Sequence, residues 1–197
     1  MVLIRIRGEL GRIGDRVLNS SYPTSFIPNI TQIIGIINAI IGKKVNNYSF
    51  SEIRKLLKEL EEKVKVRAIY IKKMPKVIDF NILRINHDAT KNKNQLTTTI
   101  EYQYLYNFEY IIDLEFLDKE LENIFVTNLQ TRNIKFTPVL GSSECLVDVM
   151  LVESIGNFEY YINNKDYIND DVLSKGEIVV LYGYKREYTF LIYKNEL

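Results

Sequence analysis

One segment, LTTTIEYQYLY (residues 96–106), alternates between two kinds of side chain and constrains the fold more than any other part of the sequence. One face of the alternation carries Leu96, Thr98, Ile100, Tyr102, Tyr104 and Tyr106, and the other carries Thr97, Thr99, Glu101 and Gln103. A period of two residues is typical of a β-strand. Residues 76–86 also have a strand pattern, and the polar segment NHDATKNKNQ (86–95) separates the two. The sequence therefore predicts a long β-hairpin with Lys91 and Lys93 near its tip.

Two helices are predicted before this hairpin. The first has isoleucines at helical spacing, preceded by Asn29, a good N-cap, and followed by Gly42, which suits the end of a helix. The second begins at YSFSEI, where Ser49 and Glu52 are spaced as a capping box. Both helices thus have recognisable start signals in the sequence.

Strands are predicted over residues 2–7 (VLIRIR), 64–72 and 108–116, and a third helix begins after Asp118. The rest of the chain has mainly strand patterns. This order predicts an α+β fold with a ferredoxin-like, RNA-recognition-type (RRM-type) antiparallel sheet. The long hairpin is an insertion in that sheet, and residues from about 150 to 197 form a C-terminal β extension.

The composition is typical of one globular domain, and we expect residues 1–197 to form it. The single cysteine cannot form an internal disulfide. Arg5 and Arg7 lie where a signal peptide needs an unbroken apolar run. The longest apolar stretch, residues 30–42, is too short to span a bilayer. These features predict a cytoplasmic protein with no membrane partner.

Charge is distributed unevenly, although the net charge is only +1. Residues 1–100 carry 18 Lys and Arg against 8 Asp and Glu, whereas residues 101–197 carry 8 against 17. Such asymmetry permits one basic face that binds a polyanion. It is also compatible with helices that have Lys-rich solvated faces, and charge alone leaves both interpretations open.

No segment matches a metal, nucleophile or nucleotide-binding motif. His87 lies in a polar turn and Cys145 begins an apolar strand, so neither a metal site nor a Cys–His dyad is predicted. GIINAIIGKK (residues 35–44) has the wrong glycine interval for a phosphate-binding loop. We expect no metal and no cofactor. The tyrosine row at 102, 104 and 106 fits either base stacking or the half-buried face of a sheet.

Three phrases of the sequence resemble a known family. They are SYPTSFIPNITQIIGIINAIIG (residues 21–42), TTTIEYQYLYNFEYIIDLEF (97–116) and FTPVLGSSECLVDV (136–149). In this order and spacing they resemble the CRISPR-associated family-five proteins, which belong to the repeat-associated (RAMP) group of RNA-binding proteins. Val147 replaces an alanine that is usual in the last phrase. The resemblance covers residues 1 to about 150.

The resemblance implies a role in antiviral defence. Members of this family hold the 5′ handle of the CRISPR guide RNA (crRNA) in the Cascade interference complex, where they cap the filament of backbone subunits. Their long hairpin, called the thumb, lies against the neighbouring backbone subunit. The resemblance therefore implies guide RNA, the backbone subunit and the large subunit as partners. In this chain the thumb is expected over residues 77–106.

The resemblance also directs attention to residues that suit contacts with single-stranded RNA. Arginines and lysines supply charge for phosphates, hydroxyls and a tyrosine ring supply polar and stacking contacts, and a Gly-Ser-Ser turn offers a possible anion nest. The expected RNA-binding residues are Arg12, Arg16, Ser20, Ser21, Tyr22, Lys91, Lys93, Gly141, Ser142 and Ser143. Cys145 and Leu146 are expected in the core.

One branch of the family also cleaves precursor CRISPR RNA without a metal, using a tyrosine, a lysine and a histidine. Such cleavage needs a base for the 2′-hydroxyl and an acid for the leaving oxygen. Only His87 could serve here, and Asn86 rather than a lysine precedes it. We therefore expect a non-catalytic subunit, with the metal-independent endoribonuclease as the alternative.

Overall fold

The computed structural model describes residues 1–14, 21–45, 49–167 except 86–96, and 176–195. For residues 21–22, 82–85 and 97–98 it describes the backbone alone. The described helices are α1 (Ile30–Ile41), α2 (Phe50–Lys63), α3 (Lys119–Gln130) and the 3-10 turn η1 (Lys165–Tyr167). The strands are β1 (Val2–Gly11), β2 (Ser21–Tyr22), β3 (Val64–Lys73), β4 (Lys76–Ile85), β5 (Thr97–Phe116), β6 (Asp148–Leu151), β7 (Tyr160–Asn164), β8 (Glu177–Tyr182) and β9 (Glu187–Lys194). None of these helices has the length and apolar character needed to cross a membrane.

The described strands form one mixed sheet, and the predicted α+β fold is confirmed. The strand order is β6-β1-β5-β3-β7-β9-β8, with β2 and β4 paired to β5 outside this path. All pairs are antiparallel except the short pairing of β2 with β5. The C-terminal strands β7, β9 and β8 extend the sheet beyond β3. The predicted C-terminal β extension is therefore part of the same sheet.

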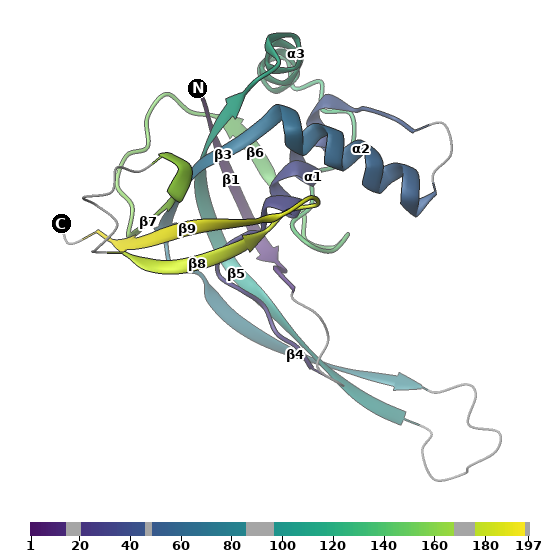
Figure 1. Cartoon of the computed structure of the whole chain (residues 1–197). Coiled ribbons are helices and arrows are strands. Elements are labelled where there is room, and N and C mark those ends of the chain that lie inside the picture. The colour runs from purple at the N-terminus through teal and green to yellow at the C-terminus, as the bar shows by residue number, and fades with distance from the viewer. Residues whose placement is uncertain (15–20, 46–48, 86–96, 168–175, 196–197) are drawn as a thin grey trace.

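Strand β5 belongs to both the body of the sheet and the hairpin. Its C-terminal half pairs with β1 and β3, and its N-terminal half pairs with β4 from Lys76–Tyr106 to Ile85–Thr97. Figure 1 shows β4 and this half of β5 extending away from the body. We call this two-stranded extension the hairpin. The predicted tip with Lys91 and Lys93 lies outside the described residues.

The sequence predicted two strands on either side of residue 107, but the structure joins them. Asn107 lies at the join and has a φ of 53°. Asparagine adopts this left-handed conformation more readily than most residues because its short polar side chain can hydrogen-bond locally. Pairing with β1 continues on both sides, from Gly8–Phe108 to Leu10–Tyr106. One residue therefore changes the local backbone without ending the strand.

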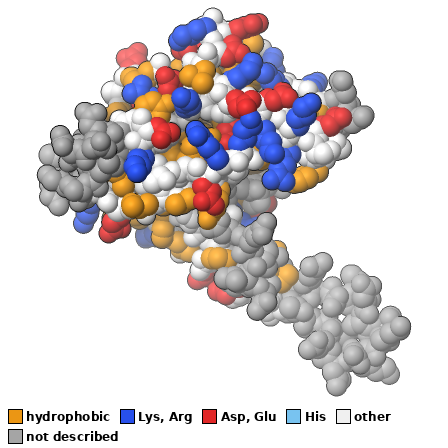
Figure 2. Space-filling model, in the orientation of Figure 1, with side chains coloured by type: hydrophobic (Ala, Val, Ile, Leu, Met, Phe, Trp, Pro, Cys, Tyr) orange, Lys and Arg blue, Asp and Glu red, His pale blue; other side chains and the backbone are white. Residues whose placement is uncertain are grey.

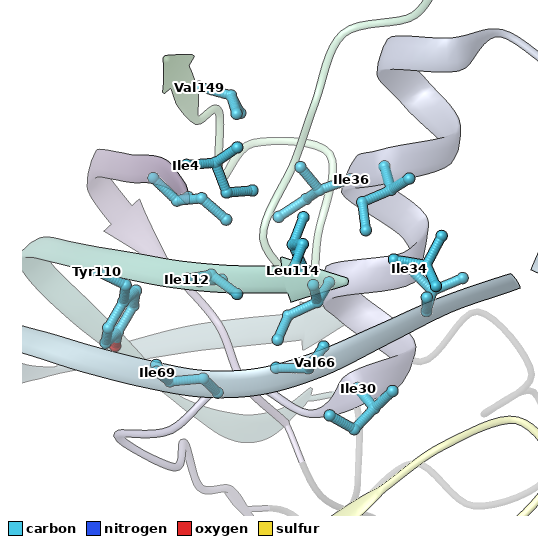
Figure 3. Close-up of a cluster of buried hydrophobic side chains, with 14 of the residues drawn as sticks. Ile4, Ile30, Ile34, Ile36, Val66, Ile69, Tyr110, Ile112, Leu114 and Val149 are labelled. Carbon is cyan, nitrogen blue, oxygen red and sulfur yellow. The ribbon is translucent and has the colours of Figure 1, made fainter. Parts of the chain in front are cut away.

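Isoleucines of α1 supply much of the core beneath the sheet. Figure 3 shows Ile30, Ile34 and Ile36 of this helix close to Val66 and Leu114 of the sheet. The predicted helix signals are confirmed: Asn29 and Gln32 form a capping box, and Gly42 ends the helix with a φ of 79°. A stiff apolar helix is thus fixed against the central strands.

The turn between β8 and β9 is attached to α2 by a buried carboxylate. Glu61 accepts hydrogen bonds from the backbone N–H groups of Tyr184 and Lys185 and from the hydroxyl of Tyr188. The side chain is almost fully buried, so its oxygens need these donors in place of water. The contact joins the C-terminal strands to the N-terminal half of the chain.

Replacement of Tyr110 by phenylalanine should destabilise the protein. The buried Tyr110 hydroxyl donates a 2.7 Å hydrogen bond to the carbonyl of Phe26, which ties the loop before α1 to β5. Loss of that donor leaves a carbonyl unsatisfied, and we expect a cost of about 1–2 kcal/mol in the free energy of unfolding. Chemical denaturation measures it. Tyr182→Phe, at a side chain 47% exposed on β8, is the matched control and should have no such effect.

Candidate nucleic-acid interface

The charge asymmetry along the sequence is partly neutralised by ion pairs within the fold. Cations of the basic first half pair with carboxylates of the acidic second half: Arg7 with Asp148, Lys63 with Asp118, and Arg67 with Asp113. On the face shown in Figure 2, basic and acidic side chains lie interspersed. The asymmetry therefore does not by itself define a basic surface, and a binding site has to be located from local geometry.

Two glycine-containing bends predicted to bind RNA lie against each other. The N–H of Arg12 donates a 2.9 Å hydrogen bond to the carbonyl of Leu140, and the carbonyl of Arg12 accepts one from the Gln32 side chain. Gly141 has a φ of 94°, and a Cβ at this position would overlap the carbonyl oxygen of Arg12. Only a glycine allows this approach. We call residues 140–145 the Gly141 turn.

The loop after residue 20 joins the same region through the base of the hairpin. Ser21 and Tyr22 pair with Glu101 and Tyr102 of β5, and the backbone of Thr24 donates to the side chain of Gln103. At the next residue of β5, the Tyr104 hydroxyl contacts the Gly141 turn. The bends at residue 21 and residue 141 thus share one region at the base of the hairpin.

The structure brings together six of the ten residues predicted to bind RNA. These are Arg12, Ser21, Tyr22, Gly141, Ser142 and Ser143. For Ser21 and Tyr22 only the backbone is described. Arg16, Ser20, Lys91 and Lys93 lie outside the described residues, as does His87.

A carboxylate that the sequence reasoning missed occupies the Gly141 turn. Oε1 of Glu144 accepts hydrogen bonds from Ser142 (2.8 Å) and Tyr104 (2.9 Å), and Oε2 accepts a 3.4 Å bond from Ser143. Its own backbone N–H and the Ser142 and Tyr104 hydroxyls hold the pKa of Glu144 below its usual value. The serine hydroxyls of the predicted anion nest therefore already donate hydrogen bonds to a carboxylate of the protein itself.

Aromatic rings cover the neighbouring face of the hairpin. Phe80 packs edge-on against Tyr104 with 5.3 Å between ring centroids, and Tyr102 lies 6.5 Å from Tyr104. The Arg12 guanidinium lies 4.9 Å from the centre of the Tyr102 ring. Burial, followed by the hydrogen bond to Glu144, raises the pKa of Tyr104 to about 12. Phe80, Tyr102 and Tyr104 form what we call the aromatic face.

Of the two residues expected in the core at the end of the Gly141 turn, one is buried and the other is exposed. Cys145 is fully buried, as predicted, and burial raises the pKa of its thiol. The prediction for Leu146 is wrong, because this side chain is 58% exposed. Leu146 pairs with Val139 in an extended segment, so its side chain points opposite to those of Cys145 and Val147.

Comparison with known proteins identifies the family. The profile of the family described as CRISPR-associated protein (Cas_Cas5) matches residues 1–189. The chain belongs to the CRISPR-associated Cas5 family. The Cas5 match extends well past residue 150, where the resemblance recognised from the sequence ended, and so includes most of the C-terminal strands. None of the curated proteins matches the chain.

Solved structures share the fold of this Cas5 chain at low sequence identity. A chain of a CRISPR RNA-guided surveillance complex matches with a TM-score of 0.63 and 13% identity, covering 98% of this chain and 88% of the other. A crystal structure of a Cas protein matches with a TM-score of 0.57 and 15% identity, covering 98% of this chain and 93% of the other. A third match is a chain from a cryo-EM structure of a type III-B Cmr-beta complex bound to target RNA and AMPPnP. Its TM-score is 0.54 and its identity 11%, and the match covers 98% of this chain and 86% of the other. At these identities the matches establish the fold.

Alanine at Gly141 should strain the backbone and separate the two bends. The positive φ and the overlap with the Arg12 carbonyl together should cost about 2–4 kcal/mol in the free energy of unfolding. Gly35→Ala in α1 is the control, because a Cβ there meets no atom within 4 Å. Alanine favours a helix interior, so the control should be more stable than the wild type by about 0.5–1 kcal/mol. Equal melting temperatures for the two variants would contradict the close approach described here.

Proposed function

We propose that this Cas5-family chain is a subunit of a CRISPR effector complex and holds the 5′ handle of the guide RNA without cleaving it. Family membership supports the complex. The observation that carries the RNA-binding proposal is the convergence of Arg12, the Gly141 turn and the strand at residues 21–22 on the aromatic face. Two of the matching structures are chains of an RNA-guided surveillance complex and of a complex bound to target RNA.

The chemistry of this region suits an unpaired RNA end. Single-stranded RNA exposes its bases, which bind by stacking on aromatic rings and by hydrogen bonds along their edges. Phosphates require positive charge or hydrogen-bond donors, and Arg12 supplies a guanidinium beside Tyr102. The glycine at 141 lets two backbone segments meet without side chains between them. RNA would lie across the surface where the hairpin base and the Gly141 turn meet.

The proposed protein partners are those that family membership implies, and the shape of the chain is compatible with them. The hairpin extends away from the body in Figure 1, so it can contact a neighbouring molecule while the body binds RNA. We assign this contact to the backbone subunit of the complex. We also propose that this chain caps the end of the filament that the backbone subunits form. The large subunit is the other proposed protein partner, and the proposed location is the cytoplasm.

Removal of the Arg12 charge should weaken RNA binding in a salt-dependent way. For Arg12→Gln we expect about five-fold weaker binding of labelled repeat RNA, and a slope of log K against log salt that is smaller by about 0.7. Titrations at several salt concentrations measure both quantities. Lys119→Gln, at an exposed position that pairs with Glu122 on α3, is the charge-matched control. Unchanged affinity and slope for the Arg12 variant would remove Arg12 from the interface.

Repeat RNA should remain intact when incubated with the protein. After incubation of labelled repeat RNA with the purified chain in EDTA, we expect no specific product. Cleavage needs both an acid and a base, and His87 is the single candidate that the sequence offers for these two roles. A specific product that disappears in His87→Ala would establish the endoribonuclease instead.

A further inference from the structure

The function proposed above uses the aromatic face as a whole and assigns no particular ligand to two residues beside Tyr104. Phe80 is 44% exposed, although its ring packs edge-on against Tyr104. Glu144 is also exposed, and it accepts a hydrogen bond from the hydroxyl of the same tyrosine. Tyr104 itself is buried. One buried ring thus contacts an exposed ring on one element and a carboxylate on another.

Phe80 is placed to stack on a flat ligand. It lies opposite Tyr102 in the β4–β5 ladder, so its side chain is on the same face of the hairpin as Tyr102 and Tyr104. Exposure of a large apolar ring to solvent is unfavourable, whereas stacking on a base covers the ring. Arg12 lies over Tyr102 on the same face, where it can contact a phosphate of the same strand.

Glu144 limits which part of an RNA can lie beside it. The donors around the carboxylate keep it ionised at neutral pH, so it repels phosphate groups. The group that faces it must instead donate hydrogen bonds. Oε1 already accepts two short bonds, but the bond from Ser143 to Oε2 is long at 3.4 Å. Oε2 therefore retains capacity for a stronger donor.

We propose that Phe80 and Glu144 form a seat for one guanine base of single-stranded RNA. The base stacks on the Phe80 ring, and its Watson–Crick edge faces the Glu144 carboxylate. Guanine presents N1–H and N2–H donors side by side, whereas adenine and cytosine place a ring acceptor beside their amino group. A carboxylate therefore favours guanine over the other bases. This inference rests on the proposed function and names the base that the site selects.

The test uses the full chain and eight-nucleotide RNAs of uridine that carry one guanosine at each position in turn. A second set replaces the guanosine by inosine, which lacks the N2 amino group, and fluorescence anisotropy gives the affinities. The best guanosine octamer should bind at least about five-fold more tightly than its inosine counterpart, because inosine loses a hydrogen bond to a charged group. Glu144→Gln should bring this ratio close to one.

Phe80→Ala should weaken binding of both octamers by about five-fold or more through lost stacking. The matched controls are Phe50→Ala, at a ring 80% exposed on α2, and Glu177→Gln, at an exposed carboxylate on β8. Neither control should change affinity or the guanosine-to-inosine ratio. Thermal unfolding shows whether each variant is folded, and the guanosine–inosine comparison on the unaltered chain needs no variant.

Any outcome other than those expected above contradicts the proposed guanine seat. If octamers bind but guanosine has no advantage over inosine, or if Glu144→Gln keeps the advantage, the seat is wrong while RNA binding stands. If no octamer binds, the seat is also wrong, and the titrations of repeat RNA with Arg12→Gln decide whether the proposed RNA binding stands.

Discussion

Backbone pairing along β5 is the constraint on which the other features of this structure depend. This strand pairs with β1, β2, β3 and β4, so it links the N-terminal strand, the loop after residue 20, the body of the sheet and the hairpin. Its register places Tyr110 and Ile112 in the core and Tyr102 and Tyr104 beside the Gly141 turn. Because side chains alternate strictly along a strand, a slip of one residue would reverse both arrangements at once.

Local signals in the sequence predicted the elements of the fold but not all of their joins. Asn29, Gly42 and Ser49 act on neighbouring backbone groups, and each was recognisable from residues within one helical turn. The continuity of β5 through Asn107 was missed, because asparagine is depleted in strands and common in turns. Pairing with β1 on both sides keeps the strand intact, and that pairing joins residues about a hundred positions apart.

The same difference between local and distant contacts separates the predicted from the unpredicted parts of the candidate site. The Gly-Ser-Ser turn was recognised from its composition, but Glu144 became important only because Tyr104, forty residues earlier, donates to it. Phe80 reaches the aromatic face through strand register, which the sequence of β4 alone does not give. The exposed Leu146 shows that an apolar residue after a turn follows the alternation of its own extended segment. The protein also balances part of its charge across distant contacts, as the pair of Arg7 with Asp148 illustrates.

The ladder between β4 and β5 makes the reach of the hairpin adjustable in fixed steps. Its ten residue pairs run without interruption from Lys76–Tyr106 to Ile85–Thr97. Each added or removed pair changes the length by about 3.4 Å and leaves the register of the body untouched. Changes of two pairs also preserve which side chains point to each face. The span of the hairpin can therefore be lengthened or shortened in fixed steps during evolution while the arrangement of side chains at its base stays the same.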